Sequence, residues 1–165
     1  MAEHVAVQAG FLDAELKPCL DAAQAGQGHV FFVDAAHFVF GTFLCCLWSV
    51  ARIFIRAASG LTGPITLVLD NARYQRNAVV EALASQLGIT LLFLPSYSPN
   101  LNLIERLWKF IKRRALYGRY HPTFAEFQAA IKEILDGLPT THAERLKTLM
   151  TLNFQLFEDV SLMAA

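Results

Sequence analysis

The chain has no excess of charge of either sign, since 14 basic residues are matched by 14 acidic residues among 165. The strongly basic balance that marks many nucleic-acid-binding domains is therefore missing from the chain as a whole. Cysteine is scarce and odd in number (Cys19, Cys45 and Cys46), with no CxxC or Cys/His metal spacing. We expect reduced, buried thiols, as in a cytoplasmic protein.

A long hydrophobic run is also missing. The most apolar stretch, Phe38 to Ala51, ends after 14 residues at Arg52, whereas a membrane-spanning helix needs about 20. The N-terminus lacks the basic region and apolar core of a signal peptide. We therefore expect a cytoplasmic protein with no membrane partner. The hydrophobic content of 55% is ample for one packed domain.

What the chain does have is apolar runs that end in acids. His29–Asp34 reads HVFFVD, and Pro64–Asp70 reads PITLVLD and is followed by Asn71. Continuous runs of this kind are typical of strands buried on both faces of a parallel sheet in an α/β fold. Such sheets place their active sites at the carboxyl ends of the strands. One aspartate there could simply cap a turn, but two indicate a carboxylate cluster.

A third apolar run, residues 89–94, leads through a proline-rich loop to a helix that begins near Ile104. Glu105 lies in the first turn of this helix, on the same face as Lys109 and Lys112 at i+4 and i+7. Taken alone, Glu105 is an ordinary first-turn acid that favours the helix dipole. The apolar face of the helix consists of Ile104, Leu107, Trp108 and Ile111.

The remaining helices are predicted from periodicity and capping residues. Phe11–Ala25 is a helix that Pro18 splits or kinks, whereas residues 1–10 look loose. Asn77–Leu87 is a helix stopped by Gly88. Its inward residues are expected to be Val79, Val80, Leu83 and Leu87. Two capping boxes, Thr123 with Glu126 and Thr141 with Glu144, predict the last two helices. Val50–Arg56 is a further strand candidate.

Two segments carry a resemblance to a known family. Val68–Arg73 (VLDNAR) and Leu94–Trp108 (LPSYSPNLNLIERLW) resemble the DDE catalytic domain of insertion-sequence transposases in the mariner superfamily. The 34 residues between Asp70 and Glu105 match the spacing in that superfamily. Val33–Phe38 (VDAAHF) resembles the first-aspartate motif of one bacterial subgroup. The resemblance covers roughly residues 11 to 155.

The resemblance implies a ribonuclease-H-like α/β core and metal-dependent phosphodiester chemistry on DNA, namely cleavage and strand transfer at transposon ends and target. It makes Asp34, Asp70 and Glu105 the catalytic metal ligands, with Asp34 bridging two ions and Glu105 completing the second site. Mg²⁺ suits such oxygen ligands, with Mn²⁺ as substitute, and paired catalytic ions sit about 3.5–4 Å apart.

The residues around Glu105 also suggest how DNA is held. Tyr97, in the loop, is a candidate for stacking on a base. The basic residues that follow are a phosphate-contacting stripe or, equally, a solvated helix face. They are Arg106, Lys109, Lys112 and Arg113. His37 is more often a loop or core histidine than a ligand, and Trp108 is more often core. Asn71 either holds the turn after its strand or orients Asp70.

The chain departs from the family between its two aspartates. Relatives have a second and third strand and a helix there, whereas this chain has only residues 35–69, and Gly60 runs directly into Leu61. This implies an internal in-frame deletion, and we also expect the chain to lack the helix-turn-helix region that precedes the catalytic domain in relatives. We therefore expect a truncated core of about three parallel strands with flanking helices. The expected domains are a helical lead-in (1–28), a truncated DDE domain (29–155) and a tail (156–165).

Three functional hypotheses follow. The first is a DDE transposase domain. The second is a non-catalytic remnant that binds DNA or the full-length transposase. The third is an unrelated α/β domain whose acids are caps, which the long segment around Glu105 disfavours. The deletion would also leave an outer edge of strand 29–34 unpaired, so we expect residues 38–57 to cover that edge or the protein to form homo-oligomers through it.

Overall fold

The computed structural model describes residues 2–34, 60–71, 76 and 78–156. The chain forms two compact units. The first, here called the sheet unit, comprises Met1–Asp34, Trp48–Asn102 and Phe154–Ala165, and the second, the helical unit, comprises Ala35–Leu47 and Leu103–Asn153. His37, Cys45, Cys46 and the predicted strand at 50–56 lie outside the described residues.

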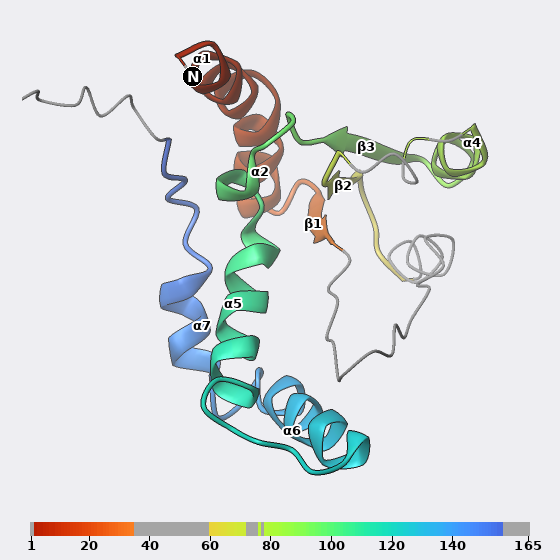
Figure 1. The fold of residues 1–165 in the computed structure, drawn as a ribbon. Helices are drawn as coiled ribbons and strands as arrows, with labels where there is room; N and C mark the ends of the chain where they lie inside the picture. The colour runs from red at the N-terminus through yellow and green to blue at the C-terminus, as the bar shows by residue number, and fades with distance from the viewer. Residues whose placement is uncertain (1, 35–59, 72–75, 77, 157–165) are drawn as a thin grey trace, which may run out of the picture. The chain divides into compact units, whose positions relative to one another are not determined.

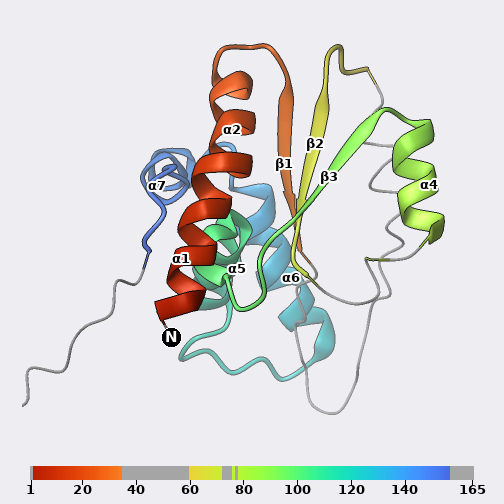
Figure 2. The ribbon, with the colours of Figure 1, turned by 90° about the horizontal axis from the view of Figure 1, so that it is seen from above.

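Three parallel strands form the centre of the sheet unit (Figures 1 and 2). They are β1 (His29–Val33), β2 (Ile65–Leu69) and β3 (Ile89–Phe93), in the order β1-β2-β3. Each strand ends one residue earlier than its sequence pattern predicts, so that an acid directly follows β1 and another directly follows β2. The predicted α/β fold with three parallel strands is confirmed.

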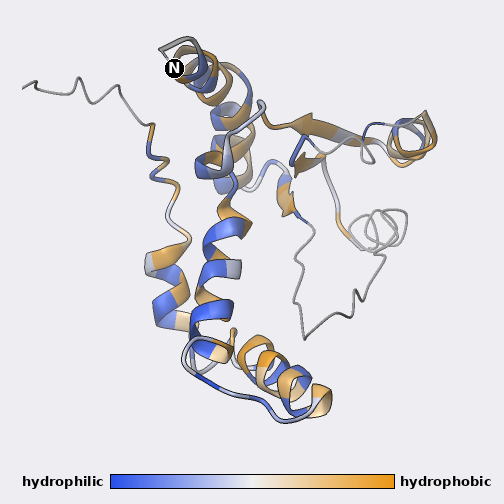
Figure 3. Ribbon diagram, in the orientation of Figure 1, coloured by the Kyte–Doolittle hydropathy of each residue, from blue (hydrophilic) through white to orange (hydrophobic). Residues whose placement is uncertain are grey.

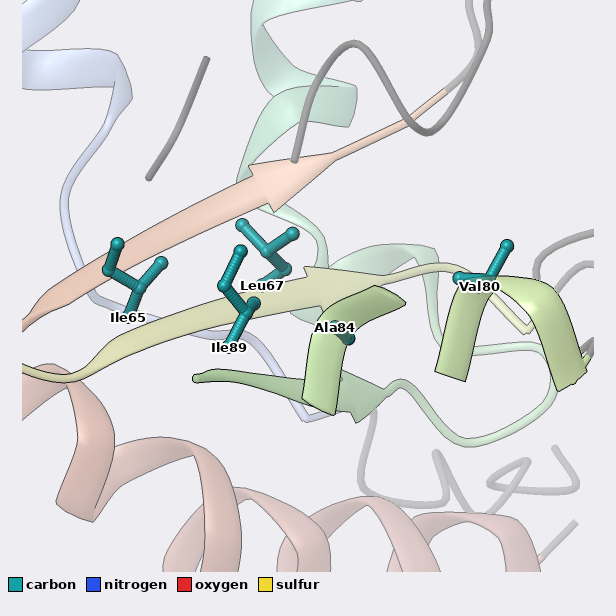
Figure 4. Close-up of a cluster of buried hydrophobic side chains, with 5 residues drawn as sticks. All are labelled: Ile65, Leu67, Val80, Ala84 and Ile89. Atoms are coloured by element: carbon teal, nitrogen blue, oxygen red, sulfur yellow. The ribbon is translucent and has the colours of Figure 1, made fainter. Parts of the chain in front are cut away.

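The central strand is buried along its whole length. Ile65 and Leu67 pack with Ile89 of β3 against Val80 and Ala84 of helix α4 (Ala78–Gln86), as Figure 4 shows. Successive side chains of a strand point to opposite faces. Because Thr66 and Val68 are buried as well, both faces of β2 are covered, which explains its unbroken apolar sequence.

One residue of α4 was assigned to the wrong face. Val79, predicted to point inward, has 77% of its surface exposed. The stripe that faces the sheet comprises Val80 and Ala84 together with the partly buried Leu83 and Leu87. Consecutive helix residues are about 100° apart, so Val79 lies at the edge of this stripe. The predicted stop at Gly88 is confirmed, because its φ of +65° is left-handed and suits glycine.

The N-terminal segment is helical, so the expectation that residues 1–10 are loose is wrong. Helix α1 (Ala2–Phe11) continues through a π-helical turn (Leu12–Leu16) into α2 (Lys17–Gln24). Pro18 has no N–H to donate to the preceding turn. The chain widens there, with the N–H of Lys17 bonded to the carbonyl oxygen of Leu12, so the helix is continuous rather than split. Buried Phe11, Leu16 and Leu20 anchor it.

The described part of the helical unit contains α5 (Leu103–Ala115), α6 (Phe124–Asp136) and α7 (Ala143–Leu149). Figure 3 shows hydrophilic and hydrophobic stretches on each helix. Leu107 and Trp108 pack against the core of this unit, as their spacing predicts. The buried residues of this core come from α5 and α6 and are Ile111, Ala115, Phe127, Ile131 and Ile134.

At one of the two predicted capping boxes, the threonine is the N-cap. The Thr123 hydroxyl accepts a hydrogen bond from the Glu126 N–H at the start of α6. The box at Thr141 does not form, because His142 is the N-cap and α7 begins at Ala143, one residue later than the box predicts. The preceding turn is closed by the N–H of His142 donating to the Gly137 carbonyl oxygen. The His142 ring also packs edge-on against Phe110, at 5.3 Å between centroids, which fixes where the helix starts.

The structure bears on two expectations from composition, the one on membrane-spanning helices and the one on cysteines. No helix among the described residues is long and apolar enough to cross a membrane. Cys19 is a free thiol, as expected, but it is half-buried rather than buried.

Candidate functional site

The site is built on the carboxyl ends of β1 and β2. In the parallel register Val33 pairs with Leu69, so that Asp34 and Asp70 are the next residues of two neighbouring strands. Adjacent strands of a sheet lie about 4.8 Å apart. The structure therefore brings these two predicted site residues to the same level of the sheet edge, both half-buried.

Asp70 carries an unusual oxygen. Its Oδ1 is buried, and it has no hydrogen-bond partner among the described residues. A buried carboxylate oxygen without a donor is costly unless a cation or water satisfies it. Two carboxylates at one sheet edge offer the hard oxygen ligands that Mg²⁺ and Mn²⁺ prefer. The residues present thus fit a divalent cation.

The third predicted acid belongs to the other unit. Glu105 is half-buried in the first turn of α5, as its sequence position predicts. It shares a helix face with Lys109, but among the described side chains no ion pair joins the two. Within each unit, over the part of the chain that is described, no three His, Cys, Asp or Glu side chains form a metal-binding group.

The loop that follows β3 is tied to Asn71, the neighbour of the second aspartate. The side-chain amide of Asn71, next to Asp70, donates to the Ser96 hydroxyl at 3.2 Å. The Ser98 hydroxyl donates in turn to the Ser96 carbonyl oxygen at 3.4 Å, and Ser98 is buried. This bond is neither of the two roles left open for Asn71, because it joins the residue next to Asp70 to the loop after β3.

A buried glutamine of α1 supports the same loop. Gln8, only 7% exposed, donates through Nε2 to the Tyr97 carbonyl oxygen at 3.2 Å. Its Oε1 accepts from Asn100 Nδ2 at 3.0 Å, and Asn100 Nδ2 also donates to the Gln155 carbonyl oxygen at 2.8 Å. Sequence reasoning missed Gln8, because a lone polar residue in an irregular N-terminal segment gives no signal of a long-range partner.

Tyr97 stands out in this loop. Its φ of +59° is left-handed, which is unfavourable for a residue with a bulky side chain. Its side chain is 87% exposed, with the ring edge-on to His4 at 6.2 Å between centroids. The hydrogen bond from Gln8 to its carbonyl oxygen helps to hold the strained backbone. Strain of this kind concentrates at functional sites.

The basic residues after Glu105 have different surroundings. The Arg106 guanidinium donates to carbonyl oxygens of the segment after α7, at 2.7 Å to Thr151, 2.7 Å to Asn153 and 3.4 Å to Leu149. It therefore fastens this segment to α5. Lys109 and Arg113 are exposed and Lys112 is half-buried.

A parallel sheet with acids following two neighbouring strands, flanked by helices, is the arrangement of a ribonuclease-H-like core. A family model described as DDE superfamily endonuclease matches residues 43–128, more than half of the chain. The chain belongs to the DDE superfamily of endonucleases. The match includes Asp70 and Glu105 and begins after Asp34. Neither the comparison with curated proteins nor that with solved structures finds a match.

Proposed function

We propose that this chain is the catalytic domain of a DDE transposase of the mariner superfamily, which cleaves DNA and transfers strands at transposon ends and target sites in the cytoplasm. The observation that carries the proposal is the pairing of Val33 with Leu69, which puts Asp34 and Asp70 on neighbouring strand ends. The 34-residue separation of Asp70 from Glu105 supports the same assignment.

Asp34 and Asp70 are the residues that would hold divalent cations, with Glu105 as a further ligand. When bound, two Mg²⁺ ions supply Lewis-acid stabilisation for the attacking and leaving oxygens of a phosphodiester. The contribution of the protein is to hold the carboxylates at neighbouring strand ends. Asn71 and Ser96 help by tying the residue next to Asp70 to the loop after β3.

DNA contacts are proposed for the exposed ring of Tyr97 and for the basic residues of α5. A tyrosine in a loop next to the acids is suited to stack on an unpaired base. Lysine and arginine side chains are suited to contact phosphate oxygens. The basic residues concerned are Lys109, Lys112 and Arg113. Arg106 was predicted with them, but its guanidinium donates to the carbonyl oxygens of Thr151 and Asn153.

We further propose that the chain has lost an internal segment between its two aspartates. Only residues 35–69 separate them, and among the described residues the sheet whose strands they follow has three strands. Residues 1–28 are then a helical lead-in, 29–155 the shortened DDE domain and 156–165 a tail.

The shortened sheet favours a second candidate function. A domain that has lost strands and a helix can retain the surface of α5 while its metal site is impaired. Such a remnant would bind DNA, or the full-length transposase, without cutting.

Nicking of supercoiled plasmid by the purified protein in Mg²⁺ or Mn²⁺ separates the two functions. The transposase proposal predicts nicking that Asp70→Asn removes and that exposed Asp21→Asn leaves intact. Equal nicking by the wild type and Asp70→Asn would exclude Asp70 as a metal ligand. DNA binding without any nicking would support the remnant.

A further inference from the structure

Charge is divided unequally between the two units, although the chain as a whole is neutral. The helical unit contains nine of the 14 basic residues and five of the 14 acidic residues, which gives it a net charge of +4. The sheet unit, with five basic and nine acidic residues, has a net charge of −4. A polyanion such as DNA is therefore attracted to the helical unit and not to the unit that carries Asp34 and Asp70.

The basic residues of the helical unit concentrate where α5 ends. Arg113 and Arg114 are exposed in its last turn, and Arg119 is exposed in the loop toward α6. Basic side chains at a helix C-terminus also stabilise the helix dipole, so their presence alone does not indicate a ligand. The indication of a ligand comes from two neighbouring aromatic residues.

Tyr117 and Tyr120 are exposed over 71% and 87% of their surface. Tyr117 is four residues after Arg113 and three after Arg114, so the three lie at one end of α5. Single exposed apolar residues are common. Two exposed tyrosines interleaved with three exposed arginines over eight residues are a different pattern, typical of surfaces on which bases stack while cations meet the phosphates.

The loop that carries them is ordered by its own contacts. The Tyr117 N–H donates to the Lys112 carbonyl oxygen, and the Arg119 N–H donates to that of Leu116. The His121 ring nitrogen lies 3.0 Å from the Ala115 carbonyl oxygen and so ties the loop to the helix end. The same ring packs edge-on against buried Phe127. The loop thus leaves His121 half-buried and both tyrosines exposed, and these contacts order the backbone that carries the tyrosines.

We propose that Arg113, Arg114, Tyr117, Arg119 and Tyr120 form a binding surface for single-stranded DNA, here called the α5-end surface. It rests on the proposed function only in taking DNA as the partner. Stacking requires exposed base faces, which a duplex offers only at its ends. The surface therefore prefers unpaired segments, such as those next to a cut or distorted site, to intact duplex.

The test is fluorescence anisotropy of a labelled oligothymidylate with the full chain in EDTA, so that no cleavage occurs. Tyr117→Leu with Tyr120→Leu weakens binding by about fivefold or more for each ring. Tyr117→Phe with Tyr120→Phe restores it, because the rings remain. The same changes leave the weaker affinity for duplex nearly unaltered.

The arginines are tested through the salt dependence. Arg113→Gln with Arg119→Gln reduces the slope of log affinity against log salt by about 1.4, since each phosphate contact with a single strand contributes about 0.7. The matched control, Lys132→Gln with Lys147→Gln, removes the same charge from exposed ion pairs with Asp136 and Glu144. It leaves the slope nearly unchanged.

Several results would overturn the α5-end surface: leucine variants that bind like the wild type, an equal loss on duplex, or capture of anionic vesicles but not of oligothymidylate. Plasmid nicking tests the proposed function separately. If no preparation nicks the plasmid but binding still depends on the tyrosines, the transposase activity is excluded and the α5-end surface stands. If the protein nicks the plasmid but the tyrosine variants bind normally, only the α5-end surface is excluded.

Discussion

Val33 of β1 and Leu69 of β2 are partners in the parallel register, and Asp34 and Asp70 are the residues that directly follow them. Parallel neighbours require a crossover of about a dozen residues or more, and residues 35–64 supply it. The shortened distance between the two aspartates in the sequence is therefore compatible with their meeting at one sheet edge. An intact edge of this kind is what metal binding by the sheet unit requires.

The loop after β3 should depend on Gln8. Gln8→Glu replaces the donor that serves the Tyr97 carbonyl oxygen with a second oxygen, so we expect the free energy of unfolding to fall by about 1–3 kcal/mol. Urea unfolding at pH 7 measures this loss. Gln86→Glu makes the same change at an exposed position of α4 and should be nearly neutral. A similar small effect for both variants would mean that the loop does not need Gln8.

Arg106 should be a structural residue of the helical unit. Arg106→Ala removes the hydrogen bonds to the carbonyl oxygens of Thr151 and Asn153, which should lower the free energy of unfolding by about 1–2 kcal/mol. It should also speed proteolysis within residues 150–156. Arg145→Ala, an exposed arginine of α7, is the control. If both variants are cut at the same rate, Arg106 does not fasten this segment.

The sheet core gives a contrast between two apolar residues. Leu67 is fully buried in β2 and Val79 is exposed on α4. We expect Leu67→Ala to cost about 2–5 kcal/mol, because it leaves a cavity between sheet and helix. Val79→Ala should change the stability by less than about 0.5 kcal/mol. A large loss at Val79 would restore the sequence-based assignment of the α4 face.

The outer edge of β1 should be covered or should associate. Among the described residues, β1 pairs only with β2, and an open edge favours pairing with another chain. We expect either that residues 38–57 cover it or that the protein forms homo-oligomers through it. Light scattering combined with hydrogen exchange distinguishes these states. A stable monomer in which the outward amides of 29–34 exchange freely would contradict both.

The sheet was predictable because its signal is local. Continuous Val, Ile, Leu and Phe runs such as Ile65–Leu69 occur where a strand is covered on both faces, and the acids after them mark the strand ends. The helix stop at Gly88 and the helix start at Thr123 could also be predicted, because few residue types can fill these backbone and capping roles.

The failures have long-range causes. Residues 1–10 looked loose because α1 is held by contacts that the sequence does not display, such as Gln8 with Asn100, 92 positions away. The capping box predicted at Thr141 does not form, because the chain there makes a turn closed by the Gly137 carbonyl oxygen and His142 packs on Phe110. The role of Arg106 depends on a segment more than 40 residues later, which no helix periodicity can indicate.

The central claim is that Asp34 and Asp70 together bind a divalent cation, and thermal unfolding in Mn²⁺ tests it most directly. At a hundredfold excess over the dissociation constant, one bound ion stabilises the fold by about 2.7 kcal/mol. We therefore predict a melting temperature that rises with millimolar Mn²⁺ in the wild type and in the control Asp13→Ala with Asp21→Ala. The rise should vanish in Asp34→Ala with Asp70→Ala. A Mn²⁺ response that persists in this variant would contradict the account, because the ion would then bind elsewhere.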